Sequence, residues 1–400
     1  MQKIELLAPA GDMEKMKVAL RFGADTVYLG GPIMQLRAAS TGFSVESLRE
    51  AATYAHSKGR KVYVAVNAFA YNRDIDAMPD YASAMADAGV DAVIVSDPGV
   101  LRRIKRSVPH LDVHISTQAN CLNYEAARVY YELGASRIVL GREMPLSDIR
   151  QLREKTPPEL ALEAFVHGAM CMSYSGRCMI SAHLTGQSAN RGDCKQSCRW
   201  RYALLEETRP KQFMEVYEDE KGTAILSAFD LSMLAHLDAL IDAGITSFKI
   251  EGRMKTAYYV ATITNAYRRA LDKSAPASDL LGELNCVSHR PYSTGFYLGT
   301  PNADKSAGDG YLQSCLFAAV VLEDAECGRV LIEQRNKIRE GDMLEVVSPS
   351  LVNASLKVHA IENEEGERLT SADVPMQQIR IDCPLPLVQG DMLRIRTGNA

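Results

Sequence analysis

The stretch ALRFGADTVYLG, at residues 19–30, contains the pattern that decides the fold. A helical segment ends at a glycine, here Gly23, and a short apolar strand follows it. Glycine at that place suits the left-handed cap of a helix, and the apolar run suits a strand buried on both faces. The alternation predicts a parallel α/β fold. The pattern returns as MADAGVDAVIVSD (85–97), YELGASRIVLGRE (131–143) and LIDAGITSFKIEGR (240–253).

Further apolar runs lie between these units, and helical spacing fills the gaps. Eight or so strand–helix units over about 250 residues favour a (β/α)8, TIM-like barrel over an open sheet. Nine candidate strands compete for eight places, so one is expected to lie outside the barrel. Residues 201–222 are expected to form an inserted β-hairpin. The further runs are IELLAPAG (4–11), KVYVAVNAF (61–69), DVHIST (112–117), LALEAFVHG (160–168) and TAILSAFD (223–230).

From about residue 283 the sequence changes to short alternating strands joined by Gly and charged turns. This texture predicts a small antiparallel β-barrel or sandwich. We therefore expect a (β/α)-barrel catalytic domain over residues 1–282 and a β-rich domain over residues 283–400. The second domain is expected to cover the barrel mouth or to grip a large substrate.

The composition is that of an ordinary globular protein, with 46% hydrophobic and 24% charged residues among 400. No run approaches the ~18 uninterrupted apolar residues that a membrane helix needs, and the N-terminus lacks a signal-peptide pattern. A cytoplasmic protein that does not enter membranes is therefore expected. The formal net charge of −5 argues against a generally basic nucleic-acid coat, although a local basic patch remains compatible with it.

Four of the nine cysteines gather within one short stretch, with the spacing C-x6-C-x15-C-x3-C. Four thiolates this close together suit one tetrahedral or cubane metal centre. The wide first pair favours an iron–sulfur cluster over zinc, whose sites usually have two tight pairs. Zinc and unligated thiols remain alternatives, and a reducing cytosol argues against disulfides. The four are Cys171, Cys178, Cys194 and Cys198.

Polar residues collect where the expected strands end, which is where (β/α)8 barrels carry their chemistry. In FKIEGRMK, strand alternation puts Lys249, Glu251 and Arg253 on one face. Charges there bind a charged substrate or one another, so a structural ion-pair network is the alternative to a catalytic site. The other strand-end residues are Tyr28, Asn67, Gln118, Arg142, Glu143, Glu163, His167 and Asp230.

Glu163 and His167 precede the first cysteine in EAFVHGAMC. An extended strand puts Glu163, Phe165 and His167 on one face. The glutamate–histidine pair is then either equipment for proton transfer, support for a metal ligand, or a satisfied buried pair.

A basic loop surrounds the last two cysteines and Trp200. Its cations are expected to contact RNA phosphates while Trp200 stacks on a base. The alternative is that they only neutralise an anionic thiolate centre. They are Arg191, Lys195, Arg199 and Arg201.

The stretch EAFVHGAMCMSYSGRCMIS, from Glu163 to Ser181, closely resembles the signature of the collagenase-like peptidases, peptidase family U32. The opening ELLAPAGDMEKMKVALRFGADTVYLGG and the segments NRGDCKQSCRWRY, IEGRMK and YSTGFYLG are similar to the same family. The resemblance runs from residue 3 to about 300. Peptidase chemistry is not what the motifs indicate, because the chain has neither HExxH nor GxSxG.

The resemblance implies an oxygen-independent hydroxylase that carries a 4Fe–4S cluster. The second cysteine pair and YSTGFYLG look most like the branch implicated in converting the wobble uridine of tRNA to 5-hydroxyuridine by prephenate-dependent chemistry. The implied partners are tRNA, prephenate or a similar small dicarboxylate, and a related family member in a hetero- or homo-oligomer. Ser232 lies near the place of the fourth cysteine in other members, so Cys198 is expected to serve as the fourth ligand.

The resemblance and the strand positions together define an expected site. In SAFDL, Phe229 stands where the family pattern has a lysine, so a contact to the anionic substrate is either missing or supplied elsewhere, for example by Lys249. Two other functions remain open: a peptidase with Cys171 or Cys178 as nucleophile and His167 as base, and a non-catalytic RNA-binding partner. The expected catalytic residues are Glu163, His167, Lys249, Glu251 and Arg253, and the expected substrate-binding residues are Asn67, Gln118, Arg142, Arg199 and Arg201.

Overall fold

The structure is a computed structural model that describes residues 3–36, 42–171, 173–200, 218–219, 222–223, 229–299 and 311–397. The chain divides into two units that interleave along the sequence, whereas the sequence pattern suggests one boundary near residue 283. The first unit contains Met1–Leu20, Ala24–Lys255 and His289–Tyr311, and the second contains Arg21–Gly23, Thr256–Ser288 and Leu312–Ala400.

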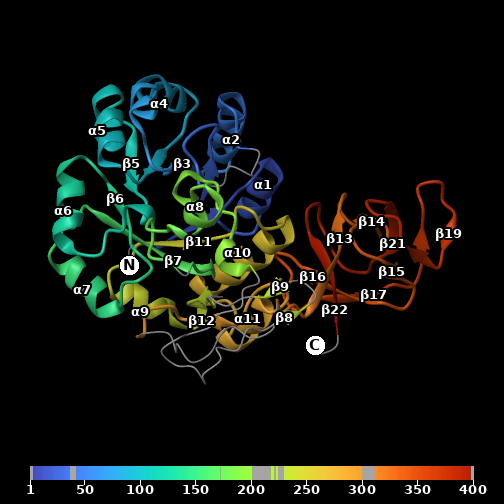
Figure 1. Cartoon of the computed structure of the whole chain (residues 1–400). Coiled ribbons are helices and arrows are strands. Elements are labelled where there is room, and N and C mark those ends of the chain that lie inside the picture. Colours follow the sequence, from blue (N-terminus) through green and yellow to red (C-terminus); the bar gives the residue numbers. More distant parts are fainter. Residues whose placement is uncertain are drawn as a thin grey trace. The chain divides into compact units, whose positions relative to one another are not determined.

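Eight parallel strands close into a barrel in the first unit, which confirms the predicted fold (Figure 1). Each strand pairs with the next in the series, and the last one, β11, pairs with both β7 and β1 and so closes the ring. The strands are β1 (Glu5–Pro9), β2 (Thr26–Gly30), β3 (Lys61–Val66), β4 (Ala92–Val95), β5 (Asp112–Ile115), β6 (Arg137–Val139), β7 (Ala161–Ala169) and β11 (Ser247–Ile250).

Helices surround this ring in Figure 1. Several end at the glycines that the repeated pattern marks; Gly134 and Gly244 have φ angles of 102° and 91°, which side chains with a Cβ rarely adopt. The helices of the first unit are α1 (Met13–Arg21), α2 (Val45–Ser57), α3 (Asn72–Asp76), α4 (Met78–Asp87), α5 (Pro98–Ser107), η1 (Thr117–Ala119), α6 (Tyr124–Glu132), α7 (Leu146–Glu154), α8 (Ile180–Thr185), η2 (Ala189–Arg191), η3 (Ser197–Arg199), η4 (Leu234–His236) and α9 (Leu237–Asp242).

The ninth candidate strand, TAILSAFD, has no described residue in the eight-stranded ring. Residues 224–228 of it lie outside the described residues, and β10 (Asp230–Ser232) runs antiparallel to β7 and parallel to β12 (Tyr292–Ser293). A strand of that direction has no place in an all-parallel ring. Within the predicted hairpin at 201–222, the described part is the short antiparallel pair β8 (Glu218–Asp219) and β9 (Gly222–Thr223), and the rest lies outside the described residues.

The second unit contains two helices and an antiparallel sheet, as its alternating sequence predicts. Burial in β14 alternates strictly, so Val330 and Ile332 enter the core and their neighbours face away. The helices are α10 (Ala257–Leu271) and α11 (Ala277–Leu284). The sheet order is β17 (Ser355–Lys357), β16 (Met343–Val347), β22 (Met392–Arg396), β13 (Cys315–Val321), β14 (Arg329–Gln334), β21 (Gln378–Asp382), β18 (Ile361–Glu362) and β19 (Arg368–Leu369), with β15 (Ile338–Arg339) and β20 (Ser371–Ala372) as a separate pair.

In the described ranges no helix combines the length and the apolar character that crossing a membrane requires.

Candidate active site

A network of charged side chains fills the barrel interior. Arg137 of β6 donates from Nη1 to Glu5 Oε1 of β1 at 2.5 Å and to Glu163 Oε2 of β7 at 2.9 Å. Lys249 of β11 donates to the other carboxylate oxygen of Glu163 at 3.0 Å. Ser247 Oγ lies 2.9 Å from Glu5 Oε1 and 3.2 Å from Glu163 Oε2. Because these strands are not all neighbours in the ring, their side chains meet inside it.

The pKa shifts of Glu5 and Arg137 keep these two residues charged. Burial acts to raise the pKa of Glu5, but the charge and hydrogen bonds of Arg137, with bonds from Tyr63 and Ser247, hold that pKa below its ordinary value. Burial acts to lower the pKa of Arg137, and the charges of Glu163 and Glu5 outweigh it and raise the pKa. Lys249 pairs with Glu163, which also pairs with Arg137. Lys249 thus belongs to a structural ion-pair network, which the sequence leaves open as the alternative to a catalytic site.

Lys249, Glu251 and Arg253 surround one tyrosine, Tyr28 of β2. The Tyr28 hydroxyl donates to Glu251 Oε2 at 2.8 Å, and its ring centroid lies 4.5 Å from Lys249 Nζ and 5.9 Å from Arg253 Cζ. Arg253 Nη1 also donates to Gln35 Oε1 at 3.0 Å. Lys249 and Arg253 are only 4% and 5% exposed. The structure thus brings together the three charged residues that strand alternation predicts on one face.

Gly30, at the end of β2, leaves the space that Gln35 and Arg253 occupy. A Cβ at Gly30 would lie 1.8 Å from Gln35 Oε1 and 2.4 Å from Arg253 Nη1. Both distances are far inside van der Waals contact, so any larger residue here displaces the arginine or the glutamine.

His167 does not share a face with Glu163, and the alternation expected along β7 is wrong beyond Phe165. Phe165 lies opposite Lys249 on β11, but His167 lies opposite Ile250, so two residues of β7 match one of β11. This irregularity turns His167 towards Tyr292, whose ring centroid lies 5.3 Å away. Burial, with smaller electrostatic effects of His289 and Lys255, lowers the pKa of His167 to about 3.

The cysteine loop is the predicted segment at residues 168–201, and its first half is held against the ends of β5 and β6. Glu143 Oε1 accepts hydrogen bonds from Ser175 N at 2.7 Å and Ser175 Oγ at 3.0 Å. Gly176 packs so closely that an added Cβ would lie 2.1 Å from Gln118 O. Arg142 donates to Ala169 O at 3.0 Å. The backbone of the predicted residue Gln118 therefore lies close to Gly176, and the side chain of Arg142 bonds the backbone at the end of β7.

Asn67 lies at the end of β3, beside the same strand ends. Its Nδ2 donates to Ser116 Oγ at 3.1 Å, and Ser116 Oγ also accepts from Gln118 N at 3.2 Å. Among the described residues, Asn67 Oδ1 and Glu143 Oε2 are buried atoms without a hydrogen-bond partner. Polar atoms of this kind are available to a bound molecule.

The second half of the loop is anchored to the segment after β3. Arg191 forms a 2.6 Å ion pair with Asp74 and stacks over Tyr71, 4.5 Å from the ring centroid. Phe69 N donates to Asn190 O at 2.9 Å. The expectation that Arg191 contacts RNA phosphate is not supported by this geometry, since Asp74 already neutralises its charge. Trp200 is exposed, whereas the Arg199 side chain and Arg201 lie outside the described residues.

The two halves of the loop are tied together around the cysteines. Asn190 Nδ2 donates to Cys178 O at 2.9 Å, and Ser181 Oγ bonds Asp193 O and Lys195 N on either side of Cys194. None of the four cysteines forms a disulfide, and all four thiols are exposed or partly exposed. In the part of the chain that the structure describes, no three His, Cys, Asp or Glu side chains come close enough to hold a metal ion. The donor set, four thiols on one closed loop, nevertheless suits a thiolate-bound centre.

Sequence reasoning missed four residues of this region. Arg290 donates from Nη2 and Nε to one buried oxygen, Asp230 Oδ1, at 2.7 and 2.9 Å, and from Nη2 to Met170 O at 3.2 Å, next to Cys171. Nothing in HRPYSTGF distinguishes this arginine from a surface one. Arg137, by contrast, is the first residue of the otherwise apolar strand β6. A charged residue at that position indicates that it forms an ion pair inside the barrel. The missed residues are Glu5, Gln35, Arg137 and Arg290.

Comparisons with known proteins agree with this architecture. The model of peptidase family U32 matches residues 11–307, and the model of that family's C-terminal domain matches residues 313–394. The tRNA hydroxylation protein P1 of Bacillus subtilis is 36% identical over 403 residues, which cover 98% of this chain and 95% of the relative. The tRNA hydroxylation protein P of Escherichia coli is 32% identical over 418 residues, covering 93% and 92%. A 23S rRNA 5-hydroxycytidine synthase of Escherichia coli is 39% identical over 270 residues, covering 68% of this chain and 39% of the relative.

Proposed function

This chain belongs to peptidase family U32, and from that membership we propose that it is an RNA-modifying enzyme that hydroxylates tRNA. The observation that carries the proposal is the similarity to tRNA hydroxylation protein P1, which extends over 98% of this chain. Two of these relatives are named for tRNA hydroxylation, and the third is named for the synthesis of 5-hydroxycytidine in 23S rRNA. We propose the wobble uridine as the target and 5-hydroxyuridine as the product.

The cysteine loop is the proposed site of a 4Fe–4S cluster. Cys171, Cys178, Cys194 and Cys198 would hold it, and a bound cluster would supply one-electron transfer without the need for molecular oxygen. The anchoring of the loop by Glu143 and Asp74 supports this proposal, because a loop that is held in place at two points loses less entropy on binding than a free one.

The charges around Tyr28 are the proposed site for prephenate or a similar small dicarboxylate. Arg253 is expected to bind a carboxylate, since the guanidinium fork matches carboxylate geometry. Lys249 is expected to add a second positive charge while Glu163 holds its ammonium group in place. Tyr28 then orients the substrate by its hydroxyl, which already donates to Glu251.

A peptidase function is disfavoured by the state of His167. A general base works best when its pKa lies near the working pH. With a pKa of about 3, His167 takes up a thiol proton poorly at neutral pH. The low pKa leaves His167 as a neutral hydrogen-bonding group at pH 7.

Nucleoside analysis tests the proposed function. tRNA from a strain that lacks the gene should lose 5-hydroxyuridine, and complementation with the intact gene should restore it. Complementation with Arg253→Ala should fail, while a variant in a surface pair, Glu125→Gln, should succeed. Unchanged 5-hydroxyuridine in the deletion strain, with no other hydroxylated nucleoside lost, would overturn the proposal.

A further inference from the structure

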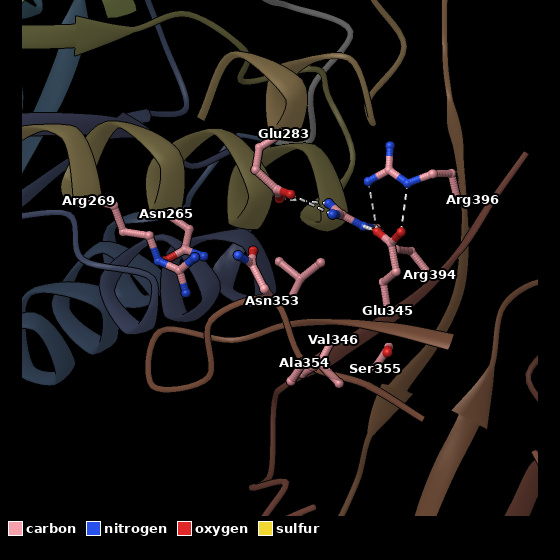
Figure 2. Close-up of a pocket in the computed structure, with 11 residues that line it drawn as sticks. Asn265, Arg269, Glu283, Glu345, Val346, Asn353, Ala354, Ser355, Arg394 and Arg396 are labelled. Atoms are coloured by element: carbon pink, nitrogen blue, oxygen red, sulfur yellow. Dashed lines mark hydrogen bonds and ion pairs between the residues drawn. The ribbon is translucent and has the colours of Figure 1, made fainter. Parts of the chain in front are cut away.

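A cavity of about 200 Å³ lies wholly within the second unit. Figure 2 shows its lining: Asn265 and Arg269 come from α10, Glu283 from α11, and the rest from β16, β22 and residues 353–355. The volume is below the ~300–1,000 Å³ of sites for drug-sized ligands. The cavity therefore suits a small ligand or one chemical group of a larger one.

Two of its three arginines are neutralised by the two glutamates. Arg394 donates to both oxygens of Glu283, at 2.8 and 2.6 Å, and to Glu345 at 2.8 Å. Arg396 forms two bonds to Glu345, at 2.6 and 2.9 Å. Figure 2 shows Arg394 between the two carboxylates. Burial acts to raise the pKa of Glu345, but both arginines outweigh it and lower that pKa.

Arg269 is the arginine of this cavity that neither glutamate neutralises. Its Nη2 donates to Ser348 O at 2.8 Å and to Leu351 O at 3.0 Å. Among the described residues, no carboxylate lies within ion-pair distance of it. A guanidinium has five N–H donors, so Nε and Nη1 keep three that these two bonds do not use. Burial lowers the pKa of Arg269, and the charge of Arg394 lowers it further against the opposite effect of Glu283.

Two amides flank this guanidinium. Asn265 lies one helical turn before Arg269 and is only 6% exposed, with Nδ2 3.4 Å from Ser348 O. Asn353 lines the cavity with a φ of 51°, in the left-handed region. Figure 2 shows Arg269, Asn265 and Asn353 on the same side of the cavity. A net positive charge beside neutral amide donors is the arrangement that binds an oxyanion.

We propose that this cavity binds a phosphate group, with Arg269 as its principal cation and Asn353 as a second donor. Arginine suits phosphate because its planar fork presents parallel N–H donors. Free phosphate and a phosphodiester of RNA share this chemistry. Assignment to the RNA strand rests on the proposed function, whereas the phosphate site does not.

Binding of inorganic phosphate to the full-length protein, measured by calorimetry, tests the site. Arg269→Gln should weaken binding at least about tenfold, since hydrogen bonds between charged groups are lost. Arg380→Gln is the matched control, because it removes one arginine of the same unit from an exposed pair with Glu323. No binding by the intact protein, or equal losses in both variants, would overturn the site.

A second variant guards against a folding effect of Arg269→Gln on the loop at 348–351. Asn353→Gly removes an amide from the cavity, and glycine accepts the φ of 51°. It should weaken phosphate binding with the melting temperature unchanged; full affinity in this variant would overturn the role of Asn353.

tRNA titrations at several salt concentrations distinguish the two sources of phosphate. If RNA supplies the group, Arg269→Gln should lower the log–log salt slope by about one unit and Arg380→Gln should not. Phosphate binding that depends on Arg269, together with an unchanged tRNA slope, would support the site and overturn its assignment to RNA. The proposed function is tested separately, by the loss of 5-hydroxyuridine in the deletion strain. An unchanged tRNA slope would therefore contradict the assignment to RNA and leave the proposed function untouched.

Discussion

Lys249 Nζ lies 3.0 Å from Glu163 Oε1 inside the barrel, and Arg137 holds the other oxygen of the same carboxylate. Glu163 therefore contacts two cations on two other strands, one of which, Arg137, it shares with Glu5. Glu163 is fully buried. This arrangement couples the stability of the barrel to the position of a lysine that is expected to bind the substrate.

Glu163→Gln should destabilise the protein strongly. The substitution leaves Lys249 and Arg137 without this negative charge, and breaking a buried ion pair costs about 3–5 kcal/mol. The free energy of unfolding from urea titration measures the effect. Glu125→Gln, in a surface pair with Arg128, should change it by less than about 1 kcal/mol. A similar small loss in both variants would show that the buried network contributes little.

Gly30→Ala should impair the site without entering the substrate position itself. The new Cβ would lie on Gln35 Oε1 and Arg253 Nη1, so Arg253 must move. tRNA hydroxylation in complemented cells should fall sharply, whereas Gly59→Ala, where a Cβ meets nothing within 4 Å, should keep activity. Gly59 has a φ of 65°, so its substitution controls for backbone strain alone. Equal activity in both variants would mean that the Arg253 position is not critical.

Replacing any one of the four loop cysteines by alanine should remove most of the iron. All four thiolates are needed to complete the ligand set of a cubane cluster. Iron analysis and absorbance near ~400 nm of anaerobically purified protein measure the loss. Cys327→Ala is the control, since Cys327 is exposed and lies in the second unit. A full iron content in Cys198→Ala would exclude Cys198 as the fourth ligand.

Arg191→Ala should loosen the cysteine loop and leave the salt dependence of tRNA binding unchanged. Its guanidinium pairs with Asp74 and Tyr71, so the loop loses an anchor but RNA loses no phosphate contact. Iron should be released faster by a chelator, and the Asp74→Ala variant should behave in the same way. A slope lowered by about one unit in Arg191→Ala would instead indicate a direct phosphate contact.

The barrel could be predicted from the sequence because four of its strands follow a glycine that ends a helix, as at Gly134 and Gly244, and the other strands are apolar runs between these units. Lys249 and Arg253 both lie near the ring of Tyr28, but strand alternation does not account for Arg253, since β11 ends at Ile250. His167 could not be placed in this way, because the irregular pairing at Ile250 depends on β11, not on the sequence of β7. Arg290 could not be found either, since its partner Asp230 lies 60 residues away in the chain.

The stability of the protein should fall as the pH drops below about 6.5, because of three buried histidines. Burial lowers the pKa values of His114, His167 and His289, and that of His167 falls to about 3. In the unfolded chain these groups take up protons near pH 6.5, so the unfolded state binds more protons and gains stability as the pH falls. Each such group contributes a slope of about 1.4 kcal/mol per pH unit.

His167→Gln should remove one of these three slopes. Between pH 5 and 6.5 Glu5 contributes little, because its ordinary pKa of 4.5 lies below this window and its pKa in the folded state is lower still. The free energy of unfolding of both proteins should therefore be measured across this window. As the pH falls, the free energy of unfolding should decrease more steeply for the intact protein than for His167→Gln, by the slope that one bound proton contributes. His110→Gln should keep the full slope, since His110 is exposed. Parallel curves for the intact protein and His167→Gln would mean that His167 takes up its proton as readily in the folded chain as in the unfolded one.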